Sequence, residues 1–139
     1  MVEFAMASSL LFAVVFGVIA IGYALYSYNV VSEAAREATR FAIVRGSACT
    51  SFTSACPAAA SDVQTYVQDL GFPGINSQSI TATTTWPTTG PSCTPSVTPC
   101  NNPGNLVEVT VSYQFPLVIP FMSSQTLTMS STSMMVISQ

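Results

Sequence analysis

The sequence lacks two residue types on which many enzymes depend: among its 139 residues there is no histidine and no lysine, and charged residues make up only 6%. A Ser-His-Asp triad, a Ser-Lys dyad, a phosphate-loop lysine and an HExxH zinc site are therefore excluded. Asp62 and Asp69 could share a helix face, but about 10 Å of helical rise would separate them. We predict that the protein is not an enzyme, with no catalytic, cofactor-binding or metal site. A membrane-tethered enzyme is the least favoured hypothesis.

Basic residues are confined to one short stretch of the chain. The three arginines are Arg36, Arg40 and Arg45, and the charged residues that follow them are all acidic: Asp62, Asp69 and Glu108. A surface with only acidic charges repels phosphate groups. Neither nucleic acid nor anionic lipid is therefore expected to bind the part of the chain after Arg45.

The longest feature is an apolar run from Phe4 to Val31 that contains no charged residue and no proline. A helix of about 20 apolar residues is long enough to cross the hydrocarbon core of a membrane. A helix is also the expected conformation, because it bonds every backbone N–H and C=O within the segment. We therefore expect a membrane-spanning helix.

Small residues recur every fourth position within this run, at Ala5, Ser9, Ala13 and Gly17. Small side chains at this spacing let two helix backbones approach closely in a membrane. The pattern therefore predicts that the helix packs against other helices. The alternative is a lone, lipid-facing anchor that happens to use alanine and glycine.

The helical pattern continues past the apolar run and becomes amphipathic. Ala34, Ala38, Phe41 and Ala42 fall on one side, while the other side carries two pairs at i, i+3 spacing, Glu33 with Arg36 and Glu37 with Arg40. Gly46 is a plausible stop. We predict one helix over residues 2–45, in which residues 1–45 form the first structural unit and residues 46–139 a head outside the membrane.

The head shows the patterns of one short helix and at least three strands. A capping box formed by Ser61 and Gln64 is expected to begin the helix, and Gly71 and Pro73 to end it. Alternating apolar residues predict strands over 79–86, 107–115 and 125–138, with Pro116 and Pro120 terminating the second. The predicted fold class is α+β: a long N-terminal hydrophobic helix and a head of one short helix packed on a three- to four-stranded antiparallel sheet.

Four cysteines, Cys49, Cys56, Cys93 and Cys100, form two pairs with the same spacing. Six intervening residues exceed the usual spacing of zinc ligands, so disulfides are the favoured hypothesis, and they place the head outside the cytosol. Four cysteines allow three connectivities, of which we favour the two local pairs. The bias toward Ser, Thr and Pro over residues 81–98 is also typical of O-glycosylated segments.

The N-terminal third resembles a known family. The opening MVEFAM, the apolar helix and the continuation VVSEAAREATRFAIVRG resemble the TadE/TadG-like proteins of tight-adherence pilus systems, with Glu3-Phe4, Arg36-Glu37 and Arg40 in the expected order over residues 2–46. The family is type IV pilin-like. The resemblance implies cleavage by a prepilin peptidase ahead of the helix, retention in the membrane, and later assembly with identical subunits by the pilus machinery.

The resemblance also implies a role for Glu3. In such proteins the acidic residue neutralises the N-terminal ammonium of a neighbouring subunit, but it is normally fifth in the mature chain. Either processing differs here, or Met1 is not the mature start. The alternative is an interfacial glutamate that the helix dipole favours.

These observations lead to one functional hypothesis and one rival. The first is a structural subunit of an extracellular type IV pilus-like filament for surface attachment. It would assemble through Glu3, Phe4 and the small residues Ala5, Ser9, Ala13 and Gly17. The rival is a single-pass, membrane-anchored binding module, or a minor pseudopilin at a pilus tip, that does not itself polymerise.

Overall fold

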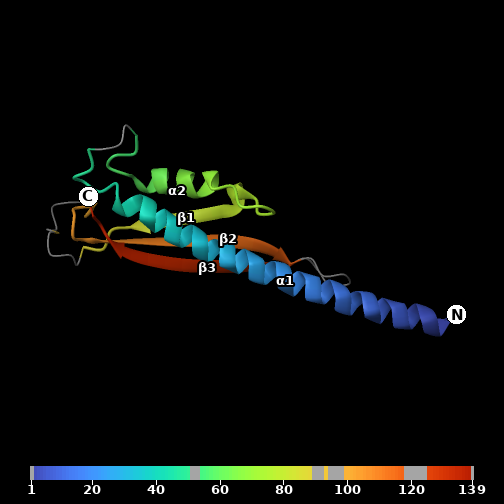
Figure 1. Cartoon of the computed structure of the whole chain (residues 1–139). Coiled ribbons are helices and arrows are strands. Elements are labelled where there is room, and N and C mark those ends of the chain that lie inside the picture. The colour runs from blue at the N-terminus through green and yellow to red at the C-terminus, as the bar shows by residue number, and fades with distance from the viewer. Residues whose placement is uncertain (1, 51–53, 89–92, 94–98, 118–124, 139) are drawn as a thin grey trace.

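The protein consists of a long helix that carries a small sheet and a short helix near its C-terminal end (Figure 1). The computed structural model describes residues 2–50, 54–88, 93, 99–117 and 125–138, with side chains from Glu3 onward. In chain order the elements are α1 (Val2–Ile43), α2 (Ala60–Asp69), the short 3-10 helix η1 (Ser77–Ser79), β1 (Ile80–Thr85), β2 (Leu106–Leu117) and β3 (Gln125–Val136). The sheet is antiparallel in the order β1-β2-β3. The predicted α+β fold class is confirmed, with three strands.

Helix α1 has two parts with different surroundings. Residues 3–22, which we call the shaft, project from the rest of the molecule, and residues 23–43 lie across the sheet (Figure 1). The first buried residue along the helix is Ser27. Two glycines in the shaft, Gly17 and Gly22, do not interrupt the helix. The chain ends at the opposite end of the molecule from the shaft, where the Ser138 N–H donates to the Ile43 carbonyl at 2.9 Å.

The core lies between α1 and one face of the sheet. The alternating valines of β2, Val107, Val109 and Val111, are fully buried, as the period-2 pattern predicts. Across from them α1 presents a row of small side chains, Ala34, Ala35, Ala38 and Ala42, each at most 3% exposed. Because alanine is short, the helix backbone approaches the sheet closely. The amphipathic prediction for this half of α1 is therefore confirmed.

Helix α2 begins two residues earlier than the predicted capping box. Its N-cap is Ala59, whose backbone N–H donates to the Asp62 carboxylate at 2.8 Å. The Gln64 side chain faces β1 instead: its Nε2 donates to the Ile80 carbonyl at 2.9 Å, and its Oε1 accepts from the Ala82 N–H. The prediction of a Ser61–Gln64 box was wrong because Gln64 bonds the backbone of the edge strand and so fixes α2 beside β1.

Strand β2 does not stop at Pro116. It continues to Leu117, with Pro116 opposite Thr126 of β3. Pairing with β1 ends at Tyr113, so at Pro116 the described strands give β2 a partner on one side only. A proline is tolerated there because it has no N–H to leave unpaired. The prediction that Pro116 terminates the strand was therefore wrong, and Pro120 lies outside the described residues.

Candidate assembly surface

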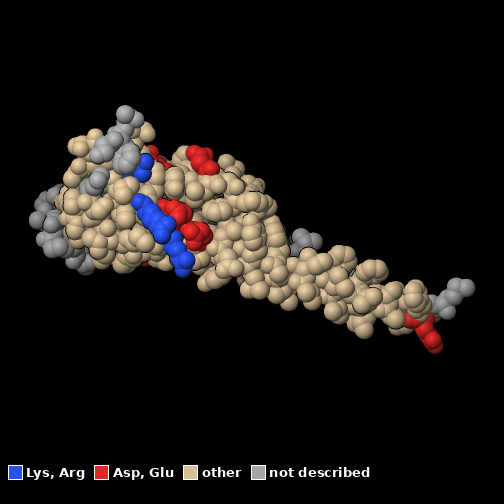
Figure 2. All heavy atoms as spheres, in the orientation of Figure 1, with Lys and Arg blue, Asp and Glu red and all other residues tan. Residues whose placement is uncertain are grey.

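The shaft is an apolar surface without cover. None of its residues from Glu3 to Gly22 is buried, and the most apolar stretch of α1 has no part buried within the molecule. Figure 2 shows it as a rod of uncharged residues, apart from one acidic side chain near its tip. Its exposed large side chains are Phe4, Met6, Leu10, Leu11, Phe12, Val14, Val15, Phe16, Val18, Ile19 and Ile21.

The free energy of exposing this apolar surface to water indicates whether the shaft can remain uncovered. Moving one such side chain out of water is worth about 1.5–3 kcal/mol, so these residues together amount to tens of kcal/mol. A whole small domain is stable by only about 5–15 kcal/mol. The shaft therefore has to be covered by lipid or by other protein chains. The length of the shaft suits a bilayer, because about 20 residues of helix extend ~30 Å, the thickness of a bilayer core.

The residues predicted to mediate assembly all lie on the shaft. Phe4 is 81% exposed, and Glu3, Ala5, Ser9 and Ala13 are exposed as well. The Ser9 hydroxyl donates to the Met6 carbonyl at 2.8 Å, so this polar group is bonded within the helix. Gly17 is half-buried, yet a Cβ placed on it would meet nothing within 4 Å. The small-residue row therefore offers open space at the helix backbone.

Two tyrosines fix where the shaft ends and the head begins. The Tyr23 hydroxyl donates to the Gly74 carbonyl, and the Tyr26 hydroxyl donates to the Pro73 carbonyl at 2.9 Å. Gly74 has a φ of +74°, and a Cβ there would lie 3.3 Å from the Tyr23 hydroxyl oxygen, so this position favours glycine. This contact was not predicted from the sequence. The available signal was a pair of tyrosines three residues apart at the end of the apolar run.

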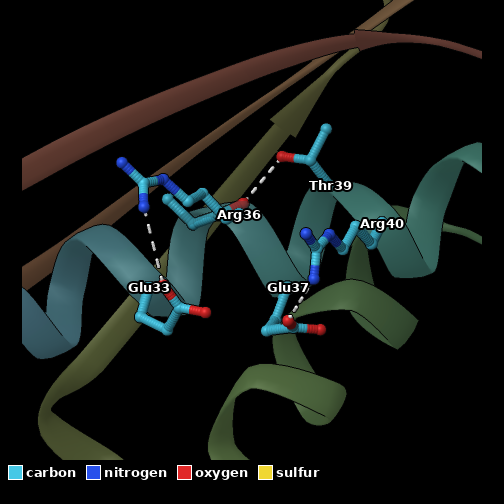
Figure 3. Close-up of polar contacts among 6 residues, drawn as sticks. Glu33, Arg36, Glu37, Thr39 and Arg40 are labelled. Atoms are coloured by element: carbon cyan, nitrogen blue, oxygen red, sulfur yellow. Dashed lines mark hydrogen bonds and ion pairs between the residues drawn. The ribbon is translucent and has the colours of Figure 1, made fainter.

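Past the junction, the exposed face of α1 carries the charged residues. Arg36 lies 3.7 Å from Glu33, and Arg40 hydrogen-bonds Glu37 at 2.9 Å (Figure 3). The expected i, i+3 pairs are thus present, and they lie in a narrow stripe over the head in Figure 2. Such exposed pairs contribute only a few tenths of a kcal/mol to the helix. Their main consequence is a polar surface on the side of this half of α1 that faces away from the sheet.

The buried side of the same segment is held by Thr39. Its hydroxyl donates to the Ala35 carbonyl at 2.7 Å, as Figure 3 shows, and lies 3.4 Å from the Ser133 carbonyl of β3. On the flank, the Phe41 ring stacks on Tyr66 of α2 with centroids 4.3 Å apart, and the Arg45 guanidinium lies over Phe41 at 3.9 Å. These contacts fasten the head to α1.

The cysteines form two local disulfides. Cys49 bonds to Cys56 and Cys93 to Cys100, with Cα–Cα distances of 5.6 and 5.7 Å. These are the two local pairs that we favoured from the sequence. Among the described residues, no group of three or more His, Cys, Asp or Glu side chains is placed to hold a metal ion.

The outer face of the sheet, opposite α1, is rich in hydroxyl groups. Thr81 and Thr83 of β1 are exposed there, and Thr110 and Thr132 share a hydrogen bond of 2.8 Å across β2 and β3. One end of this face is hollowed into a groove of about 550 Å³ without a charged side chain, lined by Asn76, Gln78, Ser79, Thr81, Ser112, Tyr113, Gln114, Pro116, Thr126 and Thr128.

Comparison with known proteins bears on the N-terminal segment. No curated protein and no solved structure matches the chain. Residues 1–40 match the family model of the TadE-like proteins. They include the whole shaft and most of the part of α1 that packs on the sheet. This match fits a pilin-like protein that is associated with a tight-adherence pilus. The resemblance seen in the sequence is therefore confirmed for this segment: residues 1–40 are TadE-like.

Proposed function

We propose that the protein is a structural subunit of an extracellular, type IV pilus-like filament, and that it assembles through the shaft of α1. Before assembly the shaft crosses the membrane, with the head on the outside. In the filament the shafts of many copies form a bundle, and the heads form its outer layer. The protein has no enzymatic role in this proposal.

The exposed shaft is the observation that supports this function most strongly. A helix that served only as an anchor would need an apolar surface and nothing more. This shaft also carries the row of small residues, and Gly17 leaves open space where a second helix could approach. The exchange of lipid for neighbouring helices loses little hydrophobic free energy, because both surroundings are apolar. Close packing then decides the outcome.

The mode of assembly follows from the shape of the subunit. One face of the shaft would contact a different face of the next copy, and a repeated head-to-tail contact that does not close gives a helical fibre. The disulfides staple a head with little charge, which suits close packing of copies. Prepilin peptidase and the pilus assembly machinery are the further partners in this proposal.

The experiment is microscopy of the material that is sheared from producing cells. Negative-stain images should show thin filaments, and mass spectrometry of those filaments should identify this chain as a main component. Filaments that contain the chain only in traces would contradict the proposal.

Filaments that contain the chain only in traces would favour the rival function, a membrane-anchored binding module or a minor subunit at a pilus tip. The observation that favours it is the uncharged groove on the outer face of the sheet, where amide and hydroxyl side chains such as Asn76, Gln78 and Thr128 converge. Neutral polar groups of this kind suit a hydroxyl-rich ligand.

A further inference from the structure

A second apolar feature lies where the shaft leaves the head. It is a notch of about 580 Å³ between α1 and the end of β2, lined by Phe16, Ile19, Ala20, Tyr23, Phe115, Pro116 and Leu117. None of these described lining residues is charged. Tyr23 and Phe115 close one end, with ring centroids 5.3 Å apart. Phe16 and Ile19 remain 49% and 60% exposed, so the notch is open toward the shaft surface.

The position of the notch along α1 gives its level in a bilayer. A bilayer core about 30 Å thick takes about 20 residues of helix, which are supplied by the shaft from Glu3 to Gly22. The residues from Phe16 to Tyr23 form the last two turns, about 10 Å of helix. The notch therefore lies at the outer edge of the hydrocarbon. Tyr23, Tyr26 and Tyr28 follow at the level of the head groups, where tyrosine is enriched.

The last residues of β2 are suited to the outer edge of the hydrocarbon. An unpaired backbone group is costly in an apolar environment. Pro116 has no N–H, and the last residues of β2 are paired with β3, Pro116 with Thr126 and Leu117 with Gln125. Among the described residues, β2 is thus still paired with β3 where it approaches the bilayer, and its last residue, Leu117, is apolar.

We propose that the notch holds an acyl chain of a membrane lipid, which seats the head on the surface of the bilayer before assembly. The lining favours lipid because it is mostly apolar, continues the apolar surface of the shaft, and has no charged group among its described residues. A protein side chain from a second copy is the competing occupant. The inference rests on the proposed membrane-spanning role of the shaft. Its test distinguishes a failure of the notch proposal from a failure of that role.

The experiment measures tryptophan quenching by lipids whose acyl chains carry bromine near the carbonyl end. The full chain is placed in phosphatidylcholine vesicles. Its single tryptophan, Trp86, follows Thr85, which pairs with Glu108, so nine residues of strand, about 30 Å, separate its level from that of Leu117. The wild-type protein is thus the control at the far end of the head. Reporters are placed in a W86F background: L117W in the notch, and L10W in the shaft.

The proposal expects that L117W loses at least as large a fraction of its emission as L10W, while Trp86 loses almost none. Quenching of L10W without quenching of L117W would overturn the notch proposal and leave the anchor intact. Absence of quenching at L10W would instead contradict the membrane-spanning shaft itself. Q125W, at the exposed position paired with Leu117, is the second reporter if L117W does not fold. Emission at L117W that changes only when the protein self-associates would assign the notch to a second copy.

Discussion

The two halves of α1 should differ in their sensitivity to the same substitution. Ala38 is fully buried between the helix and the sheet, whereas Ala13 is exposed on the shaft. Replacing Ala38 by leucine adds three carbon atoms at a fully buried position, where the helix packs on the sheet. Overpacking of a core costs about 1–3 kcal/mol, and each kcal/mol shifts the Tm of a small domain by about 4–8 °C. We therefore expect A38L to lower the Tm of the head by roughly 4–24 °C.

A13L is the matched control, because it adds the same atoms where no other part of the chain is packed. Substitutions at such surface sites change stability by less than about 0.5 kcal/mol, so the Tm of the head should stay within a few degrees of the wild type. Thermal melts in detergent, followed by near-ultraviolet circular dichroism, report the head because the rings of Tyr23, Tyr66 and Phe115 are packed there. An unchanged Tm for A38L, or a large drop for A13L, would refute this division of the helix.

Three further predictions concern assembly, docking of α2 and pH. E3A should leave the protein in the membrane but impair filament formation, because the proposed assembly pairs Glu3 with the N-terminal ammonium of a neighbouring subunit and loss of one partner of a buried ion pair costs about 3–5 kcal/mol; normal filament yield would contradict it. Q64A removes two hydrogen bonds to β1 and should cost about 1–3 kcal/mol in a denaturant melt, whereas Q68A, one turn later on α2, should be neutral. Burial, and next the nearby Tyr23, raise the pKa of Tyr113 above its usual 10.0. The neutral phenol is therefore favoured in the folded state: stability is retained below pH 10.0 and falls as the pH rises further, a decline that should be smaller in Y113F.

The periodic elements of the fold were predictable from the sequence. The alternation from Val107 to Phe115 predicts a strand, and the alanine stripe of α1 predicts a helix, because each spacing places these apolar residues on a single face of that element. The length of the apolar run also indicated that half of the helix would be without cover. These predictions required only local spacing.

The missed features depend on contacts between distant segments. Gln64 has the spacing of a capping residue, yet it bonds the edge of β1, which follows sixteen residues later. A proline usually ends a strand, but at Pro116 the pairing of β2 with β1 has already ended and only the pairing with β3 continues among the described strands. The bonds from Tyr23 and Tyr26 to the loop at Pro73 and Gly74 span about fifty residues of sequence. No local pattern specifies such contacts.

The central claim is that the shaft exchanges lipid for other copies of itself, and photo-crosslinking in producing cells tests it most directly. A photoreactive amino acid at position 13 lies on the exposed small-residue row. The account predicts a ladder of multimers, with the crosslinked peptides of both partners mapping to residues 3–22. Adducts with lipid alone, in cells that display surface filaments, would contradict it.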